Sequence, residues 1–374
     1  MSMIERAVDA LAGAGGDLVE PPVLVRAKVP LELSGETVRS RICTFIDQEA
    51  REWALRPDFT LVVAQDEVEA RRAGISGETV RRYAGPVFRL PGRPNAPVEY
   101  DQVGLEKFGA PSDVDADAWL FKTLIAATEA CGVTTGRTQF GDLSIFPAFV
   151  DAMSVAPDVA AGLKRAFRQE GGVRAFINGQ SQNQSGMGRR LAGMSKEEVA
   201  AFVDDIFAMT NVQPVGSRSA DEIAERLYER SRSSGGALSD AQKQILDSVL
   251  SLDVPLADAA SALEEIAQTH SLSGLSEQLS SFADRANKLL ATQADGFLER
   301  ARFATRFGRR FTYYDGFVFE ITDRASEEMV IFPFVAGGRY DSLLSDLSNG
   351  DVDATGLGGI IVPHRLPSQT GASV

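Results

Sequence analysis

Apolar and polar residues alternate along the chain with two different periods, which separate β-like ends from a helical middle. Residues 4–11 and 115–131 carry apolar side chains at helical spacing and each stretch stops near glycine, so both are predicted helices. Residues 19–33 look extended because Pro21 and Pro22 exclude a helix there. Short β-like runs follow at 43–47, 59–64, 86–90 and 98–109. This pattern predicts a mainly antiparallel sheet with a helix packed on it.

The middle of the chain, from about residue 154 to residue 305, repeats helical patterns rich in Ala, Ser, Glu and Gln. One of them begins at Ser195, where Glu198 completes a capping box, and it aligns the apolar residues 199, 202, 203, 206 and 207 on one face. The Ser/Gly-rich stretch 230–240 indicates a turn or linker. Because β character returns after residue 307, we expect a discontinuous core over 1–153 and 306–374 and an all-helical insertion over 154–305.

Length and composition are those of a folded protein with two or three cores. The 374 residues are 44% hydrophobic and 24% charged, and no apolar run reaches the length of a bilayer-spanning helix. Residues 1–20 lack the basic start and apolar centre of a signal peptide, so we expect a cytoplasmic protein without a membrane partner. The net charge of −14 repels a polyanion, which argues against a nucleic-acid partner.

Cysteine and histidine are scarce. Cys43 and Cys131 lie far apart outside any metal-ligand spacing, which indicates reduced thiols. His270 and His364 have no Cys or His at chelating distance along the chain. We therefore expect neither a zinc site nor a Ser-His-Asp triad, and no metal or cofactor.

Four segments place polar residues among apolar, strand-like neighbours, where an unpaired polar group is costly and tends to have a partner or a ligand. They are LRPDFT (55–60), PVFRL with DQVGLE (86–90 and 101–106), RRFTYYDGFVFE (309–320) and AGGRYDSLL (336–344). Gln102 and Glu106 are four residues apart, so on a strand they point to the same side. Together they offer a site for a cationic or hydrogen-bonding ligand.

Each segment also has a purely structural interpretation. Asp58 can belong to a turn, Arg89 and Glu106 can form an ion pair, and Gly316 can sit at the bend of a hairpin. Taken singly, the ion pair and the hairpin are more frequent than a ligand site, and the turn is about as frequent as one. The order of the four segments along one chain favours a ligand site.

That order resembles the catalytic core of the histidyl-tRNA synthetase family over essentially the whole chain apart from the helical middle. VEPPVLVRA (19–27) looks like the first class II motif, and residues 85–109 look like the second. LRPDFT is similar to the family's LRPEGT loop, and the Asp in place of Glu favours the regulatory paralogues of the family. RRFTYYDGFVFE and AGGRYD resemble the two histidine signatures, and the AGGRYD string is the strongest single signal.

The resemblance implies an α+β fold of the class II synthetase type, an antiparallel sheet flanked by helices, with an amino-acid site. It puts Gln102 and Glu106 where the family contacts the histidine amino group, Arg89 at the α-phosphate arginine and Arg309 at the catalytic arginine. The two signatures imply that tyrosines read the imidazole. The implied ligand residues are Asp58, Thr60, Arg89, Gln102, Glu106, Arg309, Tyr313, Tyr314 and Tyr340.

Departures from the synthetase pattern concern ATP and tRNA. Ala96 and Val98 stand where arginine is usual, which removes phosphate contacts. Val362 replaces a usual glycine and Pro363 follows it before the retained Arg365, which disturbs the adenosine floor. The chain also ends about where synthetases continue into an anticodon-binding domain. ATP activation and tRNA recognition are therefore expected to be lost.

The resemblance then implies a non-catalytic regulatory paralogue that acts in histidine biosynthesis. Such a protein forms a homodimer through its first-motif region, assembles with the short catalytic form of ATP phosphoribosyltransferase in a hetero-oligomer, and takes histidine as its feedback ligand. One alternative, suggested by Arg89, Arg309 and Arg365, is an active paralogue that adenylates an amino acid and transfers it to an acceptor other than tRNA. Another is a structural scaffold whose amino-acid site is vestigial.

Overall fold

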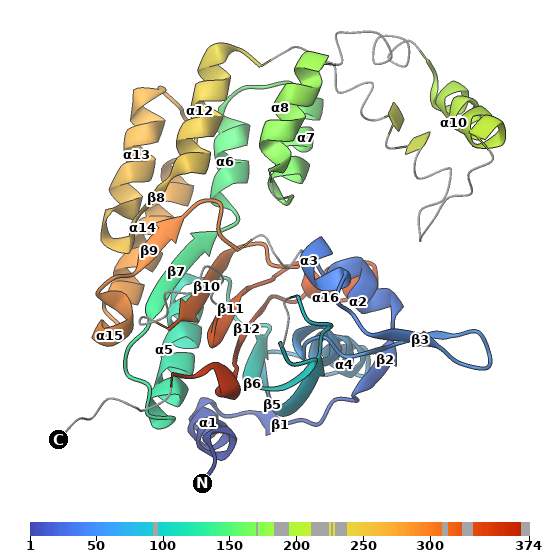
Figure 1. Ribbon diagram of the computed structural model, residues 1–374. Coiled ribbons are helices and arrows are strands. Elements are labelled where there is room, and N and C mark those ends of the chain that lie inside the picture. The colour runs from blue at the N-terminus through green and yellow to red at the C-terminus, as the bar shows by residue number, and fades with distance from the viewer. Residues whose placement is uncertain are drawn as a thin grey trace. The chain divides into compact units, whose positions relative to one another are not determined.

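The computed structural model describes residues 1–374 apart from 93–95, 170, 183–193, 211–223, 226, 229–237, 309–312, 324–331 and 368–374 (Figure 1). A nine-stranded sheet has the strand order β1-β5-β6-β12-β11-β10-β7-β9-β8, and a small sheet has the order β2-β4-β3. The strands are β1 (Asp17–Leu18), β2 (Leu24–Arg26), β3 (Thr44–Ile46), β4 (Glu52–Leu55), β5 (Thr79–Phe88), β6 (Glu99–Phe108), β7 (Arg137–Asp142), β8 (Asp253–Pro255), β9 (Arg302–Ala304), β10 (Phe317–Thr322), β11 (Val335–Arg339) and β12 (Gly356–Ile361).

Helices connect and cover these strands. The α-helices are α1 (Met3–Leu11), α2 (Lys28–Leu33), α3 (Glu36–Arg39), α4 (Thr60–Arg72), α5 (Val114–Ala130), α6 (Ile145–Ala152), α7 (Pro157–Phe167), α8 (Gly172–Gln182), α10 (Lys196–Thr210), α12 (Asp240–Ser251), α13 (Ala259–Thr269), α14 (Ser276–Leu290), α15 (Asp295–Leu298) and α16 (Leu343–Ser348). Short 3-10 turns are η1 (Ala12–Ala14), η2 (Leu256–Asp258) and η3 (Pro363–Arg365). The predicted helices over 4–11 and 115–131 are confirmed as α1 and α5.

The large sheet is mainly antiparallel, as predicted, with parallel pairing between β1 and β5 and between β7 and β9. Its centre joins distant parts of the chain, because β6 pairs with β5 on one side and with β12 on the other. Residues before and after the helical middle therefore share one sheet. The fold class implied by the sequence is confirmed.

Alternation along β6 separates two differently covered faces of the sheet. Gly359, the register partner of Leu105, faces Leu124 of α5, so odd-numbered residues of β6 face that helix. Tyr100 and Phe108 instead belong to the core cluster that contains residues of α4 and α16. Gln102 and Glu106 share this second face, as the strand period predicts, and both are buried.

The segment 59–64 was wrongly predicted to be a strand, because it forms the beginning of α4. Leu61 and Val63 pack in the core on the large sheet, whereas Val62 packs in a second core with residues of the small sheet. A helix start enclosed by two cores is apolar on every side and loses its 3.6-residue period. A short apolar run of that kind cannot be told from a buried strand.

The segment 19–33, expected to be extended, is only partly so. Strand β2 covers Leu24–Arg26, but Lys28–Leu33 is helical and contains Pro30 in its first turn. Proline is tolerated there because the N–H groups of a first helical turn have no intrahelical partner. Pro30 is therefore compatible with the helix.

The chain forms two compact units, which we describe separately: Met1–Ile145 with Val249–Val374, and Phe146–Ser248. In the second unit Phe146 and Phe167 stack with ring centroids 4.3 Å apart. The Ser195 capping box is also present there, since the Glu198 carboxylate accepts from the Ser195 N–H and the Ser195 hydroxyl accepts from the Glu198 N–H. Val199 and Val203 are buried as expected, but Ile206 is exposed.

The second unit is shorter than the insertion expected over 154–305. Residues 249–305 belong to the first unit, where β8 and β9 extend the large sheet and α14 packs against α5. The segment 154–305 is thus not all helical, because it contains two strands of three residues each. Strands that short, lying between long helices, give too few alternations to show a period of two.

Among the residues that the structure describes, no helix combines the length and the apolar character that crossing a membrane requires.

Candidate functional site

Several residues that the sequence singled out meet on the α4 side of the large sheet. We call this set the buried polar cluster. Its members are Asp58, Thr60, Tyr83, Glu106, Tyr313, Tyr314 and Tyr340. We include Gln102, which is buried on the same face of β6 as Glu106. The predicted ligand residue Arg309 lies outside the described residues. The four polar segments of the sequence therefore converge, as far as the structure describes them.

Glu106 is the centre of the buried polar cluster. Its Oε1 accepts hydrogen bonds from the Thr60 and Tyr83 hydroxyls, both at 2.7 Å, and its Oε2 accepts one from the Tyr340 hydroxyl. The side chain is fully buried, and a Cβ on Gly358 of the neighbouring strand would overlap its carboxylate. A glycine at this point of β12 is what gives the carboxylate its space.

The surroundings of Glu106 hold its carboxyl group in an unusual electrostatic state. Burial raises its pKa to about 7, although the hydrogen bonds from Tyr340, Tyr83 and Thr60 act in the opposite direction. The charge of Asp58 raises this pKa further. Removing a carboxylate from water disfavours its charged form. The group titrates near neutrality.

Asp58 lies just before α4 and is only 4% exposed. Its Oδ1 accepts from the Leu61 N–H at 3.3 Å, but its buried Oδ2 accepts no hydrogen bond from the described residues. Arg89 approaches that oxygen with Nη2 at 3.9 Å and donates its Nε–H to the Pro57 carbonyl at 2.7 Å. Burial raises the pKa of Asp58, and Arg89 opposes this rise. The turn interpretation thus leaves one carboxylate oxygen unexplained.

Gln102 is the second buried polar group with an unsatisfied acceptor. Its side chain is 1% exposed, and its Oε1 finds no donor among the described residues. Buried polar atoms are nearly always paired, so an unpaired one calls for a ligand, a water or an ion. Asp58 and Gln102 together offer two acceptor atoms to a group that carries N–H or O–H donors.

Three tyrosines line the cluster from the C-terminal segments. The Tyr340 ring centroid lies 5.8 Å from that of Tyr313 and 6.0 Å from that of Tyr314. Burial raises the pKa of all three phenols, so they are neutral and can both donate and accept hydrogen bonds. The tyrosines expected to read an imidazole therefore surround the two carboxylates.

Tyr83 was not predicted to be a site residue. Its ring stacks on the Phe59 ring with a centroid distance of 4.3 Å. The guanidinium carbon of Arg56 lies 4.0 Å from the centroid of the Phe59 ring. The Tyr83 hydroxyl reaches Glu106, and a Cβ on Gly104 would touch it. The missed signal was the strand period: Tyr83 and the expected site residues of β6 face the same side of neighbouring strands.

Arg339 and Asp341 of AGGRYD were singled out with Tyr340, but their side chains do not join the buried polar cluster. Arg339 donates Nε–H to Asp117 Oδ1 at 2.8 Å, and Arg285 donates to the other oxygen of Asp117 at 2.7 Å. Asp341 accepts from Arg339 Nη1 at 3.1 Å and from the Ser112 hydroxyl at 2.6 Å. Because successive residues of an extended chain point to opposite faces, the side chains of Arg339 and Tyr340 lie on different sides of the sheet.

The residues that correspond to ATP contacts in the synthetase pattern make contacts within the chain. Arg365 lies over the rings of Tyr100 and Phe332, with its guanidinium carbon 4.8 and 5.2 Å from their centroids, and donates to the Pro333 carbonyl. Val362 is buried, and Pro363 starts a 3-10 turn of three residues. Arg89 donates to the Pro57 carbonyl and lies near Asp58.

Two surface hollows lie elsewhere on the described residues. One, of about 330 Å³, lies between the small sheet and α4 and is lined by Leu24, Arg26, Trp53 and Asp66 among others. Another, of about 380 Å³, lies beside β1 and β5. The aromatic rings of the buried polar cluster are packed against one another.

Comparison with known proteins supplies the context of this site. The family model of histidyl-tRNA synthetase matches residues 1–198 and 199–359. The chain is 30% identical over 349 residues to an ATP phosphoribosyltransferase regulatory subunit of Chelativorans sp. (strain BNC1), covering 90% of this chain and 89% of that one. A regulatory subunit of Rhizobium etli (strain CIAT 652) is 31% identical over 348 residues, covering 89% of this chain and 88% of its own.

Solved structures agree on the fold. An ATP phosphoribosyltransferase regulatory subunit/histidyl-tRNA synthetase from Bacillus halodurans superposes with a TM-score of 0.65 at 18% identity, covering 98% of this chain and 78% of the other. Histidyl-tRNA synthetase from Nostoc sp. PCC 7120 superposes with a TM-score of 0.59 at 14% identity, covering 97% and 69%. At such identities the likeness concerns the fold.

Proposed function

The chain belongs to the family of ATP phosphoribosyltransferase regulatory subunits, which share the histidyl-tRNA synthetase fold, and from this premise we propose that it binds histidine in the buried polar cluster and has no catalytic activity of its own. In this role it transmits the histidine level to a catalytic ATP phosphoribosyltransferase subunit of the short form. The observation that carries the proposal is the pair of unsatisfied buried acceptors, Asp58 Oδ2 and Gln102 Oε1.

An α-ammonium group fits those two acceptors. It carries three N–H donors and one positive charge, while Asp58 supplies an anion and Gln102 a neutral acceptor on the same side of the sheet. Glu106, next to them, is a further anion within the same buried set. Charge-assisted hydrogen bonds of this kind are about twice as strong as neutral ones. The expected role of Gln102 and Glu106 at the amino group thus extends to Asp58.

The imidazole of histidine fits the tyrosines. A neutral imidazole has one N–H donor and one acceptor nitrogen, and a phenol can complement either. Tyr313, Tyr314 and Tyr340 bring such hydroxyls into one aromatic enclosure. The aliphatic parts of a histidine would pack on the same rings. The cluster therefore offers partners for both ends of this amino acid.

Regulation then requires that histidine binding distinguishes two states of the complex. A ligand shifts an equilibrium only by the difference in its affinity for the two states. In a hetero-oligomer, histidine bound by this chain inhibits the catalytic subunit if the inhibited arrangement holds the buried polar cluster in its ligand-binding form. Coupling of this type commonly amounts to about 1 to 3 kcal/mol.

The test is titration calorimetry of histidine into the purified protein and into its complex with the catalytic subunit. Binding is expected, and Asp58→Asn should weaken it by at least about tenfold because the ammonium loses its anion. Asp66→Asn, on α4 but beside the small sheet, is the matched control and should bind like the wild type. Absence of binding to either form of the wild-type protein would reject the proposal and favour the vestigial scaffold.

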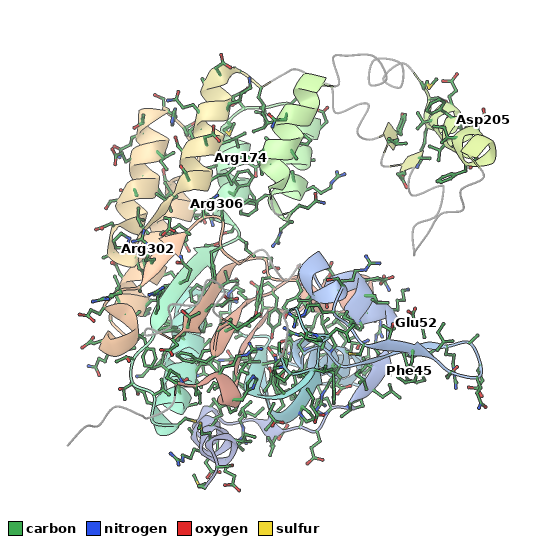
Figure 2. All side chains as sticks on the ribbon, in the orientation of Figure 1. Phe45, Glu52, Arg174, Asp205, Arg302 and Arg306 are labelled. Carbon is green, nitrogen blue, oxygen red and sulfur yellow. The ribbon has the colours of Figure 1, made fainter. Side chains whose placement is uncertain are left out.

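We also propose that two copies associate through the small sheet, in agreement with the expected first-motif interface. Val23, Leu24, Phe45 and Ile46 are large apolar residues exposed to solvent on and beside β2 and β3, between 38% and 71%. Figure 2 shows Phe45 and Glu52 on the β3–β4 hairpin. Large apolar side chains exposed on one small sheet favour its burial in an interface. Light scattering should give a dimer for the wild type and more monomer for the double substitution Phe45→Ser, Ile46→Ser.

A further inference from the structure

The guanidinium of Arg56 is held by two carbonyl groups from distant parts of the chain. Its Nε–H donates to the Pro86 carbonyl at 2.8 Å, and its Nη1–H donates to the Pro21 carbonyl at 2.5 Å. The side chain is only 4% exposed. Both acceptors belong to backbone with little freedom, because proline fixes its own φ. A planar guanidinium that donates two such hydrogen bonds has a fixed orientation.

Two aromatic rings lead from this guanidinium to Glu106. The guanidinium carbon of Arg56 lies 4.0 Å from the centroid of the Phe59 ring, which is a cation–π distance. The Phe59 and Tyr83 rings are stacked with an interplanar angle of 8°, and the Tyr83 hydroxyl donates to Glu106 Oε1. We call Arg56, Phe59 and Tyr83 the Arg56 stack. Its last member bonds a carboxylate of the buried polar cluster.

Two glycines give the Arg56 stack its space on the large sheet. A Cβ on Gly85 of β5 would lie 3.1 Å from Arg56 Nη2 and 3.6 Å from Phe59 Cζ. A Cβ on Gly104 of β6 would lie 2.8 Å from the Tyr83 hydroxyl oxygen. Protein interiors are close-packed, so a side chain at either position would crowd the stack. Both strands thus carry glycine where the stack passes over them.

The position of the Tyr83 hydroxyl depends on how the ring is held. The hydroxyl stands at the far end of the side chain, so a small tilt of the ring moves it more than any other ring atom. An O–H···O bond is favourable only at about 2.5 to 3.0 Å, and side chains at binding sites have to be held within about 0.5 Å. Contact with Phe59, itself held against Arg56, supplies this restraint.

Resting on the histidine binding proposed above, we propose that Arg56 and Phe59 are positioning residues, which set the affinity for histidine by holding the hydroxyl of Tyr83 against the buried carboxylate. Neither of them has to touch the ligand. Arg56 directly follows β4, and its N–H donates to the Val23 carbonyl at 2.8 Å. The Arg56 stack therefore fastens the buried polar cluster to the strands of the small sheet.

A double-mutant cycle with histidine as the titrant tests this chain of contacts. In titration calorimetry on the full chain, Arg56→Lys keeps the positive charge but removes the planar fork, and it should weaken histidine binding by roughly five- to tenfold. Tyr83→Phe should weaken binding by a similar factor. The double substitution should bind about as well as the weaker single variant, because the position of a hydroxyl that has been removed no longer matters.

Arg82→Lys is the matched control. Arg82 also donates to two backbone carbonyls, which belong to the segment before β1, at 2.9 and 3.1 Å. It is the neighbour of Tyr83 on β5 and so points to the other side of the sheet. This variant should bind histidine like the wild type. If Arg56→Lys does not fold, Phe59→Leu takes its place in the cycle, since it leaves both carbonyl bonds of Arg56 intact.

The pKa of Glu106 gives a readout that a general loss of stability would not move. The hydrogen bond from Tyr83 lowers this pKa, because a donor stabilises the charged carboxylate. The carboxyl resonance of Glu106 in carbon-13 NMR, assigned with Glu106→Gln, should therefore titrate at a higher pH in Arg56→Lys, as in Tyr83→Phe. In Arg82→Lys it should titrate as in the wild type.

The outcomes are distinct. Additive losses of histidine affinity in the cycle, or an unchanged pKa of Glu106 in the Arg56→Lys or Phe59→Leu variant used, overturn the inference and leave histidine binding intact. Absence of histidine binding to the wild type overturns the proposed function, and with it the role of the Arg56 stack at the ligand.

Discussion

Tyr83 on β5 and Glu106 on β6 are joined by a 2.7 Å hydrogen bond although they are not opposite each other in the sheet. The register partner of Glu106 is Arg81, and that of Tyr83 is Gly104. The phenol crosses the space left by Gly104 and reaches the carboxylate two residues further along β6. The absence of a side chain at residue 104 thus allows Tyr83 to position Glu106 inside the buried polar cluster.

Tyr83→Phe should destabilise the protein in a pH-dependent manner. A hydrogen bond to a charged group contributes roughly 1.5 to 3 kcal/mol, so the loss should approach that range above pH 7, where Glu106 is ionised, and be smaller below it. Urea unfolding of both proteins across this pH range measures it. Tyr228→Phe, outside the cluster, is a control; a pH-independent difference between Tyr83→Phe and the wild type would contradict the assignment.

The stability of the wild type should fall as the pH rises from about 4.5 to about 7. The pKa of Glu106 is raised from 4.5 to about 7 in the folded chain, so the folded state holds a proton that the unfolded state has released in this window. The free energy of unfolding should decline by roughly 2 to 4 kcal/mol relative to Glu106→Gln, which has no such proton. Parallel stability curves for the two proteins would show that Glu106 ionises normally.

Tyr340→Phe should separate regulation from assembly. The substitution removes the hydroxyl that Tyr340 donates to Glu106 and keeps the ring in its aromatic surroundings. Loss of one hydrogen bond at a buried ligand site costs about 1 to 3 kcal/mol, so inhibition of the catalytic subunit by histidine should need roughly five- to 150-fold more histidine. Co-elution with the catalytic subunit should persist. Unchanged inhibition would place the feedback ligand elsewhere.

Asp117→Asn should be among the most destabilising conservative changes in the chain. Asp117 is fully buried and accepts from both Arg339 and Arg285, and Arg285 also bonds Asp142 at 2.5 Å. Removing one partner of a buried ion pair costs roughly 3 to 5 kcal/mol.

The matched control for Asp117→Asn lies two residues earlier on the same helix. Asp115 pairs with Lys288, and its side chain is 70% exposed, so Asp115→Asn should cost less than about 1 kcal/mol. Denaturant unfolding of the two variants should therefore differ clearly. Similar stabilities would mean that the Asp117 ion pairs contribute little.

ATP-dependent pyrophosphate exchange with histidine should be absent. Arg365 is stacked on Tyr100 and Phe332, and Val98, exposed just before β6, stands where the synthetase pattern has an arginine. With two of the expected cations missing or engaged elsewhere, the charge of the transition state is less well stabilised. An exchange rate above background, abolished by Arg89→Ala, would instead support the active paralogue that adenylates an amino acid.

Local sequence patterns were sufficient to predict several of the larger elements and most members of the buried polar cluster, Tyr83 excepted. Helices over 4–11 and 115–131 and the long strand β6 follow from local periodicity, which depends only on neighbouring residues. The side shared by Gln102 and Glu106 follows from the pleat of one strand. The convergence of Asp58, Glu106 and Tyr340 came from the order of the segments that resemble the synthetase family.

Other features depend on residues that are distant in the chain and become apparent in the folded structure. Residues 59–64 became the start of α4 because cores on two sides enclose them, and the pattern of the run alone cannot reveal that enclosure. Tyr83 joined Glu106 only through the pairing of β5 with β6. The separate role of Arg339, bound to Asp117 away from Tyr340, likewise depends on a helix more than 200 residues earlier. Packing and charge balance depend on which residues meet in the folded core, so they cannot be predicted from short stretches of sequence.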